Sequence, residues 1–369
     1  MRRLILIEST DVTICDCIRK GYWARQRGML SEYAKRFEVY YYTSDSRAMQ
    51  EAMPQGVVHK VSRFGTSAYG LRHIVFYIYL VAQAFTWRTG PDGLIRLLGV
   101  TLPVLPLIKR ISNRRIVLSF HYDWARQTQK NYRRKLKVYV SGYIQRSSLA
   151  AADHVICTMG WLEEIARKDY GKGSTTVLPN FVDTALFQPV VPKRKQLVFV
   201  GRLHWSKGAD LLIDAFQRFH ASHPEFVLII LGDGEERERL ERLAAGCPHI
   251  LFCGSVPISE VAACLNESEV FVLPTRTMEG HARALVEAMA AGCKCIASDV
   301  AGNREVLVES GSEELMFQAG DARDLLAKLN YSQDYESTAQ LEFARANYAS
   351  DMLFTKELTL LDEVLEGGW

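Results

Sequence analysis

The chain has 369 residues, with 45 Lys and Arg, 42 Asp and Glu, and an apolar fraction of 48%. This length predicts two domains, and the ordinary apolar fraction allows each domain to bury a large core. Eight cysteines occur without a Cys-x-x-Cys pair, which excludes metal-type cysteine spacing. Reduced, buried thiols of a cytosolic protein are the better interpretation.

The net charge of +3 hides an asymmetry along the chain. Residues 1–190 contain 28 Lys and Arg against 14 Asp and Glu, a net of +14, whereas the remaining residues carry a net of −11. Such a split indicates an anionic partner for the first half, although basic helix faces can also be simply solvated.

The chain begins with a predicted strand over residues 3–9, whose apolar core is too short for a signal peptide. A helix over residues 22–36 and a strand over residues 38–43 follow, a β-α-β beginning that is typical of a parallel sheet with right-handed crossovers. The loop before the helix contains Gly21 and lies at the carboxyl end of the first strand, where such sheets bind ligands.

Residues 69–87 form the next predicted helix, and it is aromatic and apolar almost all round. This pattern predicts either a core helix or a helix that rests on a membrane or a partner. The longest apolar run of this segment, residues 74–87, is shorter than a bilayer span and contains Gln83, and the run 97–108 is broken by prolines, so neither is expected to cross a bilayer.

A strand over residues 115–120 ends directly before His121. A histidine just past a buried strand is well placed to contact a ligand, although a lone histidine is more often structural.

Residues 126–146 then predict a basic amphipathic helix, with the cations Arg126, Lys130, Arg133, Arg134, Lys135, Lys137 and Arg146. No nucleic-acid-binding module accompanies it, so an anionic membrane surface is the preferred partner, contacted through Arg133, Arg134, Lys135 and Lys137.

The second half opens with a strand over residues 196–203 that contains Gly201 and Arg202. Lys207 lies in the turn that leads to a helix over residues 209–221. Two fixed cations at a strand-to-helix turn would neutralise a diphosphate and stabilise it as a leaving group. Either cation alone would be an ordinary surface charge. No Asp-x-Asp triplet occurs, so we expect neither a metal nor a cofactor.

The most informative stretch is a predicted strand–loop–helix–strand unit that ends near residue 300. Glu279 and Gly280 are expected to open a helix of strong helix formers over residues 282–291, which Gly292 ends. Glu287 follows Glu279 by eight residues, roughly 12 Å along a helix. A helix N-terminus suits a diphosphate, and the flanking carboxylates could bind hydroxyl groups, which is the layout of a nucleotide sugar. The alternative is a capping Glu279 and a solvated Glu287.

The E-x7-E spacing, the sequence EAMAAG over residues 287–292 and the preceding VLPT strand together resemble the donor site of family-four glycosyltransferases. The resemblance implies an α/β GT-B fold of two Rossmann-like domains with a deep interdomain cleft. Residues 1–190 would then bind the acceptor and residues 191–349 the donor. Residues 350–369 would form a helix that crosses back to the first domain.

The resemblance also implies roles for single residues. Gly201, Arg202 and Lys207 match a G-R-x-x-x-x-K-G motif, Glu279 would lie by the sugar hydroxyls, and Glu287 would bind the ribose. The β-phosphate would be held by the backbone of Gly280, His281, Ala282 and Arg283. The turn from Gly254 to Val256 would lie against the nucleobase, and His121 by the transferred sugar. His281, Ala282 and Arg283 replace the family's commoner Phe-Gly-Leu/Val run, which leaves the choice of sugar open.

The implied activity is retaining transfer of a hexose from a nucleoside-diphosphate sugar, with UDP slightly favoured over GDP. The expected acceptor is a membrane-associated lipid or lipid-linked glycan of a cell-surface glycan or glycolipid pathway. The protein would lie peripherally on the cytoplasmic face of the membrane. Two alternatives remain: a GT-B nucleotide-sugar epimerase or hydrolase, and an inactive partner subunit of a membrane glycosyltransferase.

Overall fold

The computed structural model describes residues 2–8, 13–19, 23–45, 47–62, 69–90, 92–99, 102–123, 126 and 135–367. The chain divides into two compact units. Unit 1 comprises Met1–Leu178 and Phe354–Trp369, and unit 2 comprises Pro179–Leu353. Gly21, Arg133 and Arg134 lie outside the described residues.

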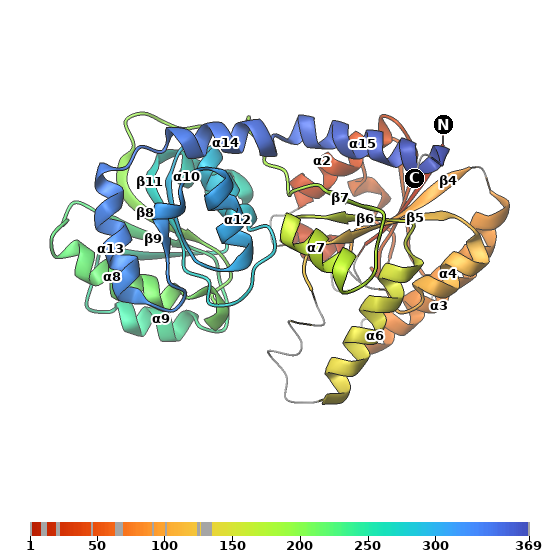
Figure 1. The fold of residues 1–369 in the computed structure, drawn as a ribbon, viewed down its shortest axis with the longest axis horizontal. Coiled ribbons are helices and arrows are strands. Elements are labelled where there is room, and N and C mark those ends of the chain that lie inside the picture. Colours follow the sequence, from red (N-terminus) through yellow and green to blue (C-terminus); the bar gives the residue numbers. More distant parts are fainter. Residues whose placement is uncertain are drawn as a thin grey trace. The chain divides into compact units, whose positions relative to one another are not determined.

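Unit 1 is built on a seven-stranded parallel sheet of order β3-β2-β1-β4-β5-β6-β7 (Figure 1). The strands are β1 Arg3–Ile7, β2 Glu38–Tyr42, β3 Val57–Lys60, β4 Gly93–Leu97, β5 Arg115–Phe120, β6 His154–Cys157 and β7 Thr175–Val177. The central strands are nearly continuous apolar runs because helices cover both faces of the sheet.

The helices of this unit are α1 Ile14–Arg19, α2 Trp23–Ala34, α3 Tyr69–Thr89, α4 Leu105–Ser112, α6 Lys135–Ala151, α7 Gly160–Lys168 and the greater part of α15 Ser350–Glu366. Helices α3, α4 and α6 cover one face of the sheet, and α2 and α15 cover the other (Figure 1). The basic helix expected over residues 126–146 is observed as α6, which runs five residues further, while residues 127–134 lie outside the described residues.

Unit 2 contains a six-stranded parallel sheet of order β10-β9-β8-β11-β12-β13. Its strands are β8 Arg194–Val200, β9 Val227–Leu231, β10 Ile250–Gly254, β11 Ser268–Leu273, β12 Lys294–Ser298 and β13 Met316–Phe317. Its helices are α8 Ala209–His220, α9 Arg237–Ala244, α10 Ile258–Glu267, α11 Arg283–Ala290, α12 Ala301–Glu309, α13 Ala322–Tyr331 and α14 Thr338–Tyr348.

The core of unit 2 lies between its sheet and the helices that pack on it. Phe199 of β8, Phe216 of α8 and Ile296 of β12 are completely buried there. Each unit is therefore a Rossmann-like α/β layer structure, which confirms the fold class expected from the sequence. Within the described ranges of the chain, no helix combines the length and the hydropathy that crossing a bilayer would require.

The order of the strands reverses beside β8 in unit 2. From β8 the chain proceeds through β9 and β10 towards one edge of the sheet, and then returns to β11, β12 and β13 on the other side. Loops at the carboxyl ends of the two strands that flank such a switch point diverge and leave a crevice where ligands bind. The carboxyl ends of β8 and β11 are therefore the first place to look for a site.

Candidate functional site

The loops after β8 and β11 bring two predicted site residues into direct contact. Gly201 and Arg202 follow β8, and a short 3-10 helix, Trp205–Lys207, leads from them to α8. The ammonium group of Lys207 forms an ion pair with Oε1 of Glu279, which lies in the loop after β11. Because β8 and β11 pair in parallel, both loops leave the same edge of the sheet at the switch point.

Glu279 is a loop residue and not the start of a helix. Helix α11 begins at Arg283 with an extended Ala282 as its N-cap, which agrees with the helix expected over residues 282–291. The placement of Glu279 at the helix opening and the capping interpretation are both wrong. Oε1 of Glu279 also accepts a hydrogen bond of 3.3 Å from the hydroxyl of Thr275. The side chains of Lys207 and Glu279 remain 27% and 18% exposed, so a ligand can reach both.

A second ion pair joins the same two loops. The guanidinium of Arg276 donates to both carboxylate oxygens of Asp210, at 2.6 and 2.9 Å, and the Arg276 amide donates to the carbonyl of Ser206 at 2.8 Å. Burial by itself raises the pKa of Asp210, but the hydrogen bonds and charge of Arg276 outweigh it and hold the pKa below its usual value. The pair is therefore charged at neutral pH and fixes the loops in a bidentate geometry.

Close backbone approaches fix the loop after β11 on two sides. Gly208 has a φ of +69°, and a Cβ placed there would lie 2.0 Å from the carbonyl oxygen of Pro274. A Cβ on Gly302, at the start of α12, would lie 2.0 Å from the carbonyl oxygen of Gly280. Only glycine fits at these two positions, so the backbone that carries Glu279 is positioned by its neighbours.

The surroundings of the Lys207–Glu279 pair favour an anion. No side chain caps the first turn of α11, so its amide groups and the positive end of its dipole are available. Arg202 is exposed, and none of the carboxylates in the described part of the chain forms an ion pair with it. Two cations and a helix N-terminus therefore belong to the two loops at one switch point.

Glu287 lies on α11 and is only 4% exposed, so its interpretation as a solvated carboxylate is wrong.

Gly254 ends β10 with a φ of +71°, and its carbonyl accepts a hydrogen bond of 2.7 Å from the Gly232 amide. Val256 is half-buried in the turn that follows. Among the described residues, no hydrogen bond or ion pair links Gly254 or Val256 to Lys207 or Glu279.

His281 is enclosed in the loop between Glu279 and α11. Its ring packs edge-on against Tyr348 at 4.8 Å, and neither ring nitrogen has a hydrogen-bond partner in the described structure. Burial, with a contribution from the charge of Arg283, lowers the pKa of His281 to about 3, so the ring is neutral.

Asn180 is a site residue that the sequence reasoning missed. Its Nδ2 donates to the carbonyl of His281 at 2.8 Å, and its Oδ1 accepts from the guanidinium of Arg283 at 3.3 Å. It thereby holds the first turn of α11 from outside the loop. The only local signal was a polar side chain in the sequence PNFVD, residues 179–183, and such a signal gives no indication of contacts with residues 101 and 103 positions away.

His121 belongs to unit 1, where it follows β5 as expected. Its Nε2 donates to the carbonyl of Leu98 at 3.3 Å. The buried Asp123 accepts from the Arg126 amide at 3.0 Å and from Gln145 at 2.9 Å, and so fixes the loop that carries His121.

The guanidinium of Arg126 pairs with Asp123 and Asp169, so this predicted surface cation is engaged within unit 1. Lys135 and Lys137 lie in the first turn of α6.

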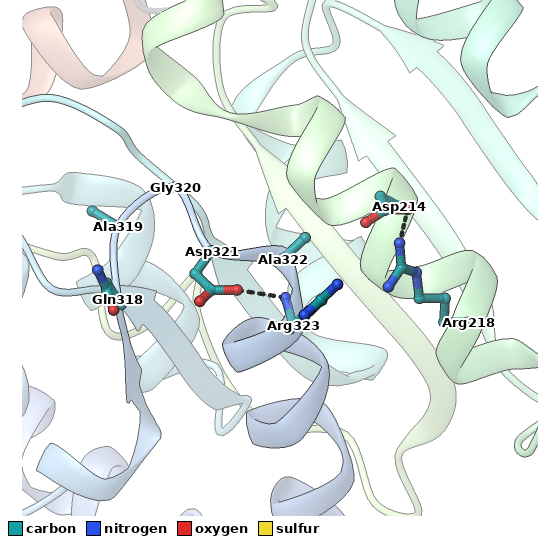
Figure 2. Close-up of a pocket in the computed structure, with 8 residues that line it drawn as sticks. All are labelled: Asp214, Arg218, Gln318, Ala319, Gly320, Asp321, Ala322 and Arg323. Atoms are coloured by element: carbon teal, nitrogen blue, oxygen red, sulfur yellow. Dashed lines mark hydrogen bonds and ion pairs between the residues drawn. The ribbon is translucent and has the colours of Figure 1, made fainter.

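A hollow of about 520 Å³ elsewhere in unit 2 contains none of the predicted site residues (Figure 2). It lies between α8 and the start of α13 and is lined by Asp214, Arg218, Gln318, Ala319, Gly320, Asp321, Ala322 and Arg323. Asp214 pairs with Arg218, and Asp321 caps α13 through the Arg323 amide. Both carboxylates are thus engaged locally, which does not favour this hollow as the site.

Nowhere in the described residues do three or more His, Cys, Asp or Glu gather in a way that could hold a metal ion.

Two Rossmann-like units and a cation–carboxylate pair at a switch point define a protein of the GT-B fold. The crystal structure of Anabaena Alr3699/HepE in complex with UDP and glucose matches 98% of this chain and 100% of its own, with a TM-score of 0.74 and 17% identity. At this identity the likeness establishes the fold alone.

The family follows from the sequence comparisons. Residues 27–186 match the model described as Glycosyltransferase Family 4, and residues 194–332 match the model described as Glycosyl transferases group 1. Together the two matches cover well over half of the chain. The chain belongs to the family 4, group 1 glycosyltransferases.

Two curated relatives illustrate the similarity. A phosphatidylinositol N-acetylglucosaminyltransferase subunit of Arabidopsis thaliana is 30% identical over 171 residues, which are 43% of this chain and 38% of the relative. The phosphatidyl-myo-inositol mannosyltransferase of Mycolicibacterium smegmatis is 32% identical over 165 residues, which are 42% of each chain. The chain thus spans about two fifths of the length of these two relatives.

Proposed function

We propose that this protein is a retaining glycosyltransferase that moves a hexose from a nucleoside-diphosphate sugar to a membrane-associated lipid or lipid-linked glycan. The observation that carries the proposal is the Lys207–Glu279 pair at the switch point of unit 2. A fixed cation and a fixed carboxylate, both partly exposed, match the phosphate and the sugar hydroxyls of such a donor.

Each side chain of the site has a distinct task in this proposal. Arg202 and Lys207 bind the diphosphate, and the uncapped first turn of α11 adds backbone amides to the β-phosphate. Glu279 accepts hydrogen bonds from the sugar, and the buried Glu287 accepts them from the ribose. Asn180 acts on the first turn of α11 through His281 and Arg283, as a positioning residue.

The proposed reaction exchanges one bond of the anomeric carbon for another on the same face of the sugar. The bond from this carbon to the β-phosphate oxygen breaks, and a bond to the acceptor oxygen forms. The acceptor proton passes to an oxygen of the departing diphosphate, whose growing charge Arg202 and Lys207 stabilise. His121 of unit 1 would contact the transferred sugar.

UDP is the favoured nucleotide and a lipid the favoured acceptor. The Anabaena structure binds UDP and glucose, and the two relatives are named for phosphatidylinositol acceptors. The basic first half of the chain, with a net of +14, supports peripheral attachment to the cytoplasmic face of an anionic membrane.

The test is a measurement of nucleotide release. The protein is incubated with UDP-sugars or GDP-sugars, with and without a lipid extract, and free nucleotide and labelled lipid are quantified. We expect release only when lipid is present, together with labelled lipid. Release without lipid would instead indicate an epimerase or a hydrolase. If no sugar turns over although UDP binds, the inactive partner subunit is the better description.

A further inference from the structure

Helix α3 is apolar on both of its faces, and only one of them is covered. Phe76, Leu80 and Trp87 point inward and are at most 2% exposed. On the opposite side, Leu71, Ile74, Ile78 and Phe85 are 53–65% exposed. Their spacing of three, four and seven residues places them in one stripe along the helix. The core-helix alternative thus describes one face of α3, and the other face is exposed.

Helix α6 presents a similar stripe on the same side of unit 1. Leu136, Tyr139 and Tyr143 are 66–74% exposed and again follow a spacing of three and four residues. Helix α4 packs against both α3 and α6, and the three helices cover the same face of the sheet (Figure 1). The exposed Leu107 of α4 adds to the apolar surface. We call the exposed apolar side chains of α3, α4 and α6 together the apolar face; exposed apolar side chains that gather on neighbouring helices often mark a binding surface.

The charges of these helices are of one sign. Helices α3, α4 and α6 together contain seven Lys or Arg and no Asp or Glu. Lys109 is paired with Asp153, which lies outside the three helices. Helix α15, on the opposite face of the sheet, contains five Asp or Glu and one Lys. The helices that cover this face of the sheet therefore combine exposed apolar side chains with an excess of basic over acidic residues in their sequences.

We infer that the apolar face of unit 1 binds the surface of an anionic bilayer, with the outer side chains of α3 and α6 inserted among the lipids. Cations beside an apolar stripe match anionic head groups above acyl chains, and tyrosines are favoured at that boundary. A second copy of the same face would oppose cations to cations with no carboxylate from these helices to pair them.

This inference rests on the proposed function for the membrane-bound acceptor. It adds an apolar contribution to the membrane attachment, which would be fully sensitive to salt if charge alone produced it. Electrostatic attraction is screened at high ionic strength, whereas burial of apolar surface is not. Binding should therefore fall as salt rises but level off above zero.

The experiment is vesicle sedimentation with the full chain. Wild type is compared with Ile74→Ser/Ile78→Ser and with Leu136→Ser/Tyr139→Ser, which change exposed side chains on α3 and α6. The matched control is Leu243→Ser/Val308→Ser, two exposed apolar residues on helices of unit 2. Vesicles contain phosphatidylglycerol with phosphatidylcholine, or phosphatidylcholine alone, at low and at high salt.

We expect each unit 1 variant to partition at least about 10-fold less onto phosphatidylglycerol vesicles at high salt, with the control variant unchanged. Circular dichroism and UDP binding are measured on the same samples, and both should match wild type. Equal partition of wild type and both unit 1 variants would overturn the inference. So would a wild-type dimer in sedimentation that these variants abolish, because a second copy would then cover the face. If the wild-type protein itself does not bind UDP, that result would instead count against the proposed function.

Discussion

Lys207 and Glu279 form an ion pair, so each holds the other in a defined position at the edge of the unit 2 sheet. We expect Lys207→Ala and Arg202→Ala each to lower the rate of sugar transfer by about 10²-fold or more, the usual effect of losing one preorganised charge at a reacting centre. Initial rates with the identified donor measure this. Lys195→Ala is the control, because that cation pairs with Glu269. Wild-type rates in both site variants would refute the assignment.

The two carboxylates should behave differently when removed. Glu287→Ala should mainly weaken nucleotide binding, because its proposed partner is the ribose, whereas Glu279→Ala should mainly lower kcat, because its partner is the reacting sugar. Calorimetry with UDP and steady-state kinetics separate the two effects. The Lys207→Ala/Glu279→Ala double variant should lose less than the product of the single losses, since the residues are in contact. Identical behaviour of the two single variants would contradict this division.

His281 makes the stability of the protein sensitive to acid. Its pKa of about 3 in the folded protein lies far below the ordinary value, because the ring is buried. The unfolded chain therefore takes up a proton below about pH 6.5 that the folded chain does not, and stability falls as the pH drops from there towards 3. At about pH 5 the resulting decrease in the free energy of unfolding is about 2 kcal/mol.

The His281→Phe variant should lose this acid sensitivity while it keeps an aromatic contact with Tyr348. We expect its melting temperature to fall less than that of wild type between about pH 7.5 and pH 5, where the free energy of unfolding changes by the amount estimated above. Differential scanning calorimetry measures this. His249→Phe, at an exposed position, is the control. A parallel fall in wild type and His281→Phe would show that His281 carries no such effect.

At the scale of elements, α15 is held to unit 1 by a buried charge network. Glu357 of α15 accepts hydrogen bonds from Arg96 of β4, at 2.9 Å, and from the Tyr33 hydroxyl of α2, at 2.7 Å. All three residues are at most 7% exposed. Because a buried charge is costly without its partner, Glu357→Ala should destabilise the protein by about 3–5 kcal/mol.

Denaturant unfolding followed by fluorescence measures the effect of Glu357→Ala. The control is Glu366→Ala in the same helix, whose pair with Arg2 is exposed and should contribute less than about 1 kcal/mol. Arg96→Met/Glu357→Leu should recover part of the loss, since neither charge is then left unpaired. Equal stability of Glu357→Ala and Glu366→Ala would rule out a structural role for the network.

The elements themselves were largely predictable, and the conformation of the loops that join them was not. Short β-branched runs such as 270–273 identify buried parallel strands because covered sheets need apolar residues on both faces. Helix α11 begins at Arg283, one residue after the start expected at Ala282, whereas Glu279, expected at the helix opening, lies in the loop before the helix. The reason is tertiary: the carbonyl of Gly280 packs against Gly302 of α12, and this holds residues 279–282 out of the helix.

At the scale of the whole molecule, the proposed chemistry depends on side-chain cations instead of a bound metal. The chain has no Asp-x-Asp triplet, and Arg202 and Lys207 supply the positive charge for the diphosphate. We therefore predict that sugar transfer persists in the presence of EDTA. The measurement compares rates in EDTA, in magnesium and in manganese. Abolition by EDTA and recovery with either metal would contradict the prediction.

The sequence by itself determined the fold class, the two-domain organisation and the family. It also identified Arg202, Lys207, Glu279 and Glu287 as candidates, because the spacing within each of the two pairs is a local property that a motif records. Gly292 could be recognised as the residue after a helix end, and it has the left-handed conformation expected there, with a φ of +77°.

Only the tertiary structure decided which of these residues meet. Lys207 and Glu279 are 72 positions apart, and they pair because β8 and β11 are neighbours in the sheet. The burial of Glu287 and the contacts of Asn180 with His281 and Arg283 likewise depend on elements that pack together from distant parts of the chain. A sequence pattern reports the periodicity of one segment, but burial and pairing depend on what covers it. The outer face of α3 is apolar in sequence like its inner face, and only packing distinguished the two.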